Sequence, residues 1–170
     1  MTYHEMLGAQ YEPNPFVVDT VEIKQRFRDL QSVVHPDRWV GKGSERQDAA
    51  ATMSARINEA LHRLSNPLLR VEYILAHEGH AGEETDKLED PTLLMEILEM
   101  RELVEGAESR EVVDEVRSEN AVKLEETVQE IEQLVGEKDW AAVKSAAVKL
   151  KYLQGIEQAA AAWPHRFNDH

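Results

Sequence analysis

Apolar residues recur along this chain at steps of three and four, the spacing that places side chains on one face of an α-helix. One such stripe extends to residue 34 after Asp19, a residue type suited to a helix N-cap. A second stripe follows Ser44, which we also expect to cap its helix, and extends to about residue 65. The stripes contain Ile23, Phe27, Leu30 and Val34, and then Ala50, Met53, Ile57, Leu61 and Leu64. The pattern predicts two amphipathic helices packed as an antiparallel hairpin.

The turn of this hairpin carries the tripeptide His35-Pro36-Asp37. Pro36 is expected to end the first helix, because a residue before proline is disfavoured in the helical region. A short helix over residues 3–7 is expected to precede the hairpin. A helix over residues 67–76 is expected to follow it, with Pro67 at the favoured first position. These elements predict an N-terminal helical domain over residues 1–77.

The second half of the chain predicts three more amphipathic helices. They cover about residues 90–104, about residues 110–135, and a stretch from about residue 139 until Pro164 ends it. Three such helices with short connections make an antiparallel bundle, here over residues 90–170. The polar, acidic stretch of residues 78–89 is the candidate linker. Because strand patterns are almost absent, we predict an all-α protein with a helical hairpin domain followed by a three-helix bundle.

The charge balance narrows the classes of partner. The chain has 33 Asp and Glu against 19 Lys and Arg, a formal net charge of −14. This argues against nucleic-acid and anionic-membrane binding, because phosphate contacts need clustered cations. There is no cysteine, and no apolar run approaches the roughly 20 residues of a membrane span. Glycine-rich phosphate loops and nucleophile motifs are also missing, so we expect no metal, no cofactor and no enzymatic activity of the chain itself.

The tripeptide in the turn is the candidate site of the N-terminal half. Lys24 and Arg28 precede it at an i, i+4 spacing, so they form a local basic patch on an acidic chain. In a turn fixed by proline, Asp37 offers a positioned carboxylate to an arginine of a partner. A plainer interpretation is that His35 and Asp37 only cap and stabilise the loop. The spacing alone favours this plainer interpretation.

Longer stretches of the sequence resemble a known family. Residues 27–38 look like the second helix and signature loop of a J-domain, and residues 55–75 look like the more specific J-domain end of the HscB family. Residues 90–102 resemble that family's scaffold-binding helix, and residues 149–153 resemble the matching segment of its last helix. The resemblance covers nearly the whole chain, with separate motifs in the right order.

The resemblance implies a J-type co-chaperone of iron–sulfur cluster assembly. Residues 1–77 are then a J-domain that stimulates ATP hydrolysis by a DnaK-type, HscA-like chaperone, and the bundle delivers an IscU-like cluster scaffold protein to that chaperone. His35, Pro36 and Asp37 would trigger ATP hydrolysis, and Lys24 and Arg28 would dock on an acidic chaperone surface. The scaffold-binding residues carried over from the family are Leu94, Met95, Leu98, Glu99, Glu102 and Tyr152.

The helical pattern independently marks the first bundle helix as apolar on two sides. One stripe, suited to packing the bundle, contains Leu93, Ile97, Met100 and Val104. At about 100° per residue, Leu94, Met95 and Leu98 fall roughly opposite, near acidic residues. An apolar patch with an acidic rim is typical of a protein-binding face. Tyr152 also falls opposite the apolar stripe of its helix and is expected to be exposed. The alternative is that these side chains pack against the first domain or the linker.

Two other functions stay open. A helical adaptor would bind another partner without activating a chaperone, and binding to a cluster scaffold distinguishes it from a co-chaperone. An enzyme with His35 and Asp37 as an acid–base pair would need a concave pocket beside them. Residues 14–16 and 65–70 resemble fungal mitochondrial members, which favours the mitochondrial matrix, with the bacterial cytoplasm as the alternative.

Overall fold

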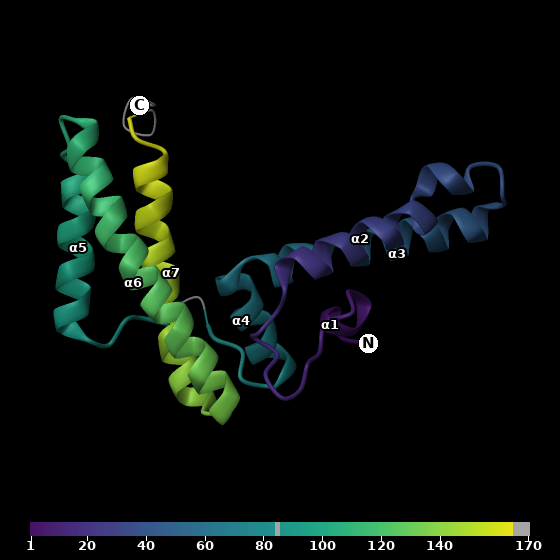
Figure 1. Ribbon diagram of the computed structural model, residues 1–170, viewed down its shortest axis with the longest axis horizontal. Helices are drawn as coiled ribbons and strands as arrows, with labels where there is room; N and C mark the ends of the chain where they lie inside the picture. The colour runs from purple at the N-terminus through teal and green to yellow at the C-terminus, as the bar shows by residue number, and fades with distance from the viewer. Residues whose placement is uncertain (84–85, 165–170) are drawn as a thin grey trace. The chain divides into compact units, whose positions relative to one another are not determined.

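The computed structural model describes residues 1–83 and 86–164, and it is helical throughout, with no strand in that part of the chain. The chain divides into two compact units, Met1–Ile74 and Leu75–His170, which are described separately below. The elements are α1 (Tyr3–Met6), α2 (Thr20–Val34), the 3₁₀ helix η1 (Pro36–Trp39), α3 (Ser44–Ser65), α4 (Pro67–His77), α5 (Pro91–Glu105), α6 (Arg110–Glu137) and α7 (Trp140–Ala161) (Figure 1). The all-α prediction is confirmed.

In the first unit, α2 and α3 pack along each other as the predicted hairpin (Figure 1). Asp19 is the N-cap of α2, and its carboxylate accepts hydrogen bonds from the backbone N–H groups of Val21 and Glu22. The predicted stripe of α2 faces the hairpin core, which it shares with α1 and α3. The buried members of that core are Met6, Leu7, Ile23, Ile57, Ala60 and Leu64. The apolar residues that recur with the helical period therefore form the core of the hairpin.

Two predictions about α3 are wrong in detail. Ser44 is the first residue of the helix and not its cap. The cap is Gly43, at a φ of 102°, where a residue with a side chain would be strained. Met53 was assigned to the buried stripe, but 40% of it is exposed. It lines a shallow hollow near the hairpin turn, together with Trp39.

The C-terminal end of α3 is held by a buried arginine. Arg70 is 7% exposed, and its guanidinium donates to the carbonyl oxygens of Leu64, at 2.9 Å, and Phe16, at 2.8 Å. Leu64 lies in the last turn of α3, where backbone carbonyls have no partner within the helix. Burial lowers the pKa of Arg70 from its ordinary value. One side chain thus joins α4, the end of α3 and the loop before α2.

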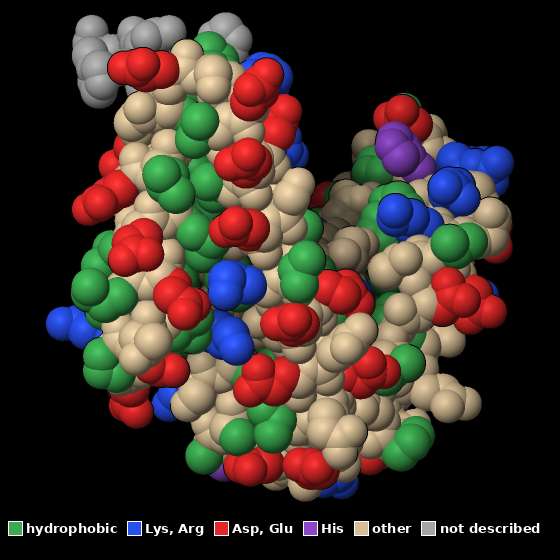
Figure 2. All heavy atoms as spheres, turned by 60° about the vertical axis from the view of Figure 1, so that its left-hand side comes forward, with side chains coloured by type: hydrophobic (Ala, Val, Ile, Leu, Met, Phe, Trp, Pro, Cys, Tyr) green, Lys and Arg blue, Asp and Glu red, His purple; other side chains and the backbone are tan. Residues whose placement is uncertain are grey.

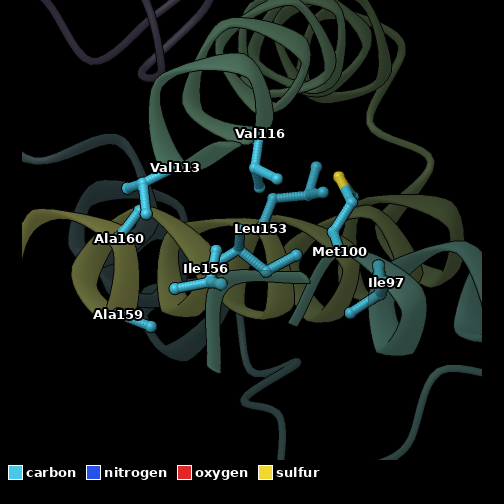
Figure 3. Close-up of a cluster of buried hydrophobic side chains, with 9 residues drawn as sticks. Ile97, Met100, Val113, Val116, Leu153, Ile156, Ala159 and Ala160 are labelled. Carbon is cyan, nitrogen blue, oxygen red and sulfur yellow. The ribbon is translucent and has the colours of Figure 1, made fainter. Parts of the chain in front are cut away.

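The second unit contains the predicted three-helix bundle. Helices α5 and α7 run in the same direction and α6 runs against them (Figure 1). Figure 3 shows buried side chains from all three helices converging on one core. Ile97, Met100 and Val104 from α5 belong to this core, as their stripe predicted, and Leu93 packs against it. The bundle thus buries one of the two apolar faces of α5.

Aspartates cap two of the three bundle helices. The Asp90 carboxylate accepts from the N–H groups of Thr92 and Leu93 before α5, and Asp139 accepts from Ala142 at the start of α7. Within the described residues, Leu88 packs against the bundle core, although it was assigned to the linker. The domain limits at residues 77 and 90 stay a prediction. None of the helices in the described ranges is long and apolar enough to span a membrane.

Candidate functional site

The His35-Pro36-Asp37 turn lies where α2 gives way to η1 and is held by backbone and side-chain bonds. The N–H of His35 donates to the carbonyl of Gln31, which completes the last turn of α2, at 3.0 Å. The indole Nε1 of Trp39 donates to the carbonyl of Val33, also at 3.0 Å. Pro36 occupies the first position of η1, where a missing N–H costs nothing. The turn is therefore fixed from both sides.

His35 and Asp37 face solvent at this turn. Their side chains are 54% and 89% exposed, with Nδ1 of His35 lying 3.7 Å from the Asp37 carboxylate. Nδ1 also accepts the backbone N–H of Asp37 at 3.2 Å, so the ring acts as an N-cap for η1. In the neutral ring this places the proton on Nε2. His35 therefore does cap η1, and this role leaves its Nε2 atom and the Asp37 carboxylate exposed to a partner.

The basic patch on α2 is also exposed. Lys24 and Arg28 both face solvent, and Nη1 of Arg28 donates to the side chain of Gln25 at 3.2 Å. Gln25 in turn donates to the carboxylate of Asp29 at 3.1 Å. Residues 1–74 contain ten Asp and Glu against nine Lys and Arg, while residues 75–170 contain 23 against ten. The patch therefore lies on a unit with almost no net charge, and nearly all of the net negative charge of the chain lies on the other unit.

The second candidate surface, which we call the α5 face, consists of Leu94, Met95, Leu98, Glu99 and Glu102. Met95 is 60% exposed and Leu98 is 50% exposed, while Leu94 is half-buried. Both glutamates face solvent. The face is therefore not sealed inside the second unit. Figure 2 shows apolar and acidic side chains intermixed over the surface of this unit.

Tyr152 is more buried than the sequence pattern predicted. It is partly buried and packs against the bundle core, together with Leu93 and Leu124. The prediction of an exposed tyrosine is wrong because α5 and α7 lie close enough for a large ring to reach the core from the flank of its helix. A Cβ atom built on Gly155 of α7 would lie 3.7 Å from Nη1 of Arg101 on α5. Because the two helices are parallel, Tyr152 lies one turn back on α7, level with Leu98 one turn back on α5.

An acid–base site at the turn finds no support in the geometry. A shallow hollow close to the turn is lined by Val34, Trp39, Arg46, Ala49, Ala50 and Met53. Neither His35 nor Asp37 belongs to this lining. In the described part of the chain, no three His, Asp or Glu side chains are grouped so that they could hold a metal ion. Both candidate surfaces are suited to protein contacts.

Sequence reasoning missed Gln31, and it assigned Trp39 to packing of the loop, as the structure shows. Gln31 joins α2 to α3 through its side chain, and Trp39 holds η1 to the end of α2. The four-residue spacing between Gln31 and His35 was visible in the sequence, since it places Gln31 in the last turn of the helix. Its partner on α3, however, depends on how the two helices are aligned, which periodicity does not give.

Comparisons with known proteins agree with this arrangement. The model of the HSCB C-terminal oligomerisation domain matches residues 89–161. A co-chaperone protein HscB homolog from Aliivibrio fischeri is 30% identical over 165 residues, which cover 93% of this chain and 94% of the relative. The crystal structure of human co-chaperone protein HscB superposes with a TM-score of 0.88 at 28% identity, covering 95% of this chain and 81% of the human chain.

Chaperone HscB from Vibrio cholerae superposes with a TM-score of 0.82 at 25% identity, covering 99% of this chain and 98% of the other. The similarity thus includes both units, the turn between α2 and α3, and the three-helix bundle. Sequence and structure lead to the same family: the chain belongs to the HscB family of co-chaperones.

Proposed function

We propose that this protein is a J-type co-chaperone that stimulates ATP hydrolysis by a DnaK-type, HscA-like chaperone and delivers an IscU-like iron–sulfur cluster scaffold protein to it. The observation that carries this proposal is the exposed His35-Pro36-Asp37 turn at the tip of the α2–α3 hairpin in a chain of the HscB family. The α5 face gives the same molecule a second surface for a protein partner.

The turn would act on the chaperone through positioned charge. The Asp37 carboxylate, 89% exposed and anchored through its backbone N–H, can accept two hydrogen bonds from one arginine. Nε2 of His35 offers a donor beside it. Lys24 and Arg28 would guide the approach of an acidic chaperone surface, since exposed charges mainly raise the rate of encounter. Through these contacts the chain would act as an activator of the chaperone.

The α5 face would bind the scaffold. Leu94, Met95 and Leu98 supply apolar contact area, Tyr152 completes their flank from α7, and Glu99 and Glu102 lie along the side. In such interfaces a few central apolar and aromatic side chains supply most of the affinity, and the polar rim excludes water. Because Leu94 and Leu98 are only partly buried, they contribute little to the stability of the bundle, and their exposed apolar surface supports a role in binding.

The comparisons do not support the expected mitochondrial location, because the curated relative from Aliivibrio fischeri is bacterial. We propose the bacterial cytoplasm, which the sequence left as the alternative. Both proposed partners would be found in that compartment.

Two variants measured in two assays test the proposed function. His35→Gln should abolish stimulation of the chaperone ATPase and leave scaffold binding unchanged, because the turn and the α5 face share no residue. Leu98→Ser should weaken scaffold binding and leave stimulation in the absence of scaffold unchanged. Leu98 is chosen because it is half exposed, so the fold should tolerate serine there. If either variant failed in both assays, the assignment of separate tasks to the two surfaces would be wrong.

A further inference from the structure

A shallow groove lies between the C-terminal end of α5 and the start of α6. Its apolar part consists of Leu103, Ala107 and Val112, and its carboxylates are Glu99, Glu102 and Glu108. Leu103 is 52% exposed although it is a leucine on a bundle helix. Gly106 also lines the groove. This groove was not recognised from the sequence.

The groove is continuous with the α5 face. At about 100° per residue, Leu98 points toward α7 and Leu103 toward α6, with Glu99 and Glu102 between them. Two contacts fix these directions. Arg101 reaches the Gly155 position on α7, and the Glu96 carboxylate lies 3.3 Å from Nζ of Lys123 on α6. The exposed side of α5 is therefore an acidic ridge with one apolar flank against α7 and another against α6.

The charge of the groove decides which class of partner fits it. Three carboxylates surround an apolar floor, in a unit with 23 acidic against ten basic residues. A second copy of this chain placed on the groove through the same face would bring carboxylates against carboxylates, and like charges in contact oppose association. A partner segment with Lys or Arg next to an apolar side chain fits the groove, because the apolar side chain can contact the apolar residues and the cation can pair with the carboxylates.

We infer that this groove is a second seat of the scaffold-binding surface. It would receive an apolar side chain of the scaffold protein that is flanked by basic residues, while Leu98 and Tyr152 hold another part of the same partner across the ridge. The inference rests on the proposed function, because it takes the scaffold as the occupant. It adds Leu103, Val112 and Glu108, which lie outside the residues carried over from the family.

Affinity for the cognate cluster scaffold protein tests this second seat. Leu103→Ser in the full chain should weaken binding about fivefold or more, as expected for an apolar contact at a protein interface. Glu108→Gln should weaken binding less and should make the affinity less sensitive to salt, because one charge interaction is lost. Val122→Ser is the matched control. Val122 lies on α6 outside the groove and is 59% exposed, so its replacement should leave the affinity unchanged.

The outcomes separate this inference from the proposed function. If Leu98→Ser weakens scaffold binding but Leu103→Ser behaves like Val122→Ser, the second seat is wrong and the proposed function stands. If Leu98→Ser has no effect either, scaffold binding by the α5 face fails, and this inference fails with it. If sedimentation shows a dimer of the wild type that Leu103→Ser dissociates, the groove binds a second copy of the chain, which overturns the inference. Thermal unfolding of each variant verifies that the fold is retained.

Discussion

The side chain of Gln31 on α2 and Ser54 on α3 exchange two hydrogen bonds. Nε2 of Gln31 donates to the backbone carbonyl of Ser54 at 3.2 Å, and the Ser54 hydroxyl donates to Oε1 of Gln31 at 2.9 Å. Nε2 also lies 3.0 Å from Oδ1 of Asn58, one turn further along α3. The backbone carbonyl of Gln31 accepts the N–H of His35. Gln31, in the last turn of α2, therefore both accepts the N–H of His35 and fixes α2 against α3.

Replacing Gln31 should weaken both stability and signalling to the chaperone. Gln31→Ala removes the exchange with Ser54, which is 8% exposed and would lose its side-chain partner. Loss of such bonds should lower the free energy of unfolding by about 1–3 kcal/mol, as measured by chemical denaturation. Stimulation of the chaperone ATPase at saturating co-chaperone should also fall, because the turn is no longer fixed relative to α3. Gln25→Ala, on the exposed side of α2, is the control for stability and should have little effect. Equal destabilisation by both variants would show that Gln31 does not clamp the hairpin.

The buried arginine should matter for stability much more than an exposed one. Arg70→Met leaves the carbonyls of Leu64 and Phe16 without their donor, and unsatisfied buried groups cost about 1–3 kcal/mol each. We expect a clear loss in the free energy of unfolding of the full chain. Arg63→Met is the control. Arg63 pairs with Glu59 at the surface, and the median exposed pair contributes about 0–1 kcal/mol. A loss no larger than that of Arg63→Met would contradict the structural role of Arg70.

The basic patch on α2 should act through long-range attraction. Substituting Lys24 and Arg28 together by Gln should reduce stimulation at limiting co-chaperone concentration, because encounter with an acidic chaperone surface becomes slower. Stimulation by the wild type should fall as salt rises, and the variant should show a flatter dependence. Arg56→Gln removes an exposed charge from α3 and is the control. If Arg56→Gln has the same effect, only the total charge of the unit matters and not the patch.

Leu98 and Tyr152 should differ in what they contribute to folding. Tyr152 packs against the bundle core, so Tyr152→Ala should lower the free energy of unfolding by about 2–4 kcal/mol as well as weaken scaffold binding. Leu98 is half exposed, and Leu98→Ala should cost less than about 1 kcal/mol while still weakening binding. Tyr152→Phe keeps the packing and isolates the hydroxyl. Denaturation curves of the three variants measure these differences, and equal destabilisation by Leu98→Ala and Tyr152→Ala would contradict the observed burial.

Helix positions were predictable because they depend on local sequence, although the cap of α3 is Gly43 and not Ser44 as predicted. Asp19, Asp90 and Asp139 cap the helices that follow them, and the stripe from Ile23 to Val34 faces the core as its spacing predicted. These features require only that a helix has about 3.6 residues per turn and that its first N–H groups need acceptors.

Features that depend on how helices align were not predictable. The Gln31–Ser54 exchange joins residues 23 apart in sequence, and the Arg70–Phe16 bond joins residues 54 apart. Tyr152 lies on the flank of α7, where its burial depends on the closeness of α5. The turn residues were found through resemblance to a family, since the spacing alone favoured a capping role. The structure shows that His35 caps η1 and is exposed as well.

In the proposed function one molecule carries both the turn that activates the chaperone and the face that holds the scaffold, so the two surfaces must lie on the same chain. The most direct test measures ATP turnover by the cognate DnaK-type chaperone with scaffold present, adding wild type, His35→Gln, Leu98→Ser or an equal mixture of the two variants. We predict that wild type and scaffold together stimulate turnover well beyond wild type alone, and that neither variant nor their mixture reproduces this gain. A mixture that restored the wild-type rate would contradict the claim, because it would show that the two surfaces act from separate molecules.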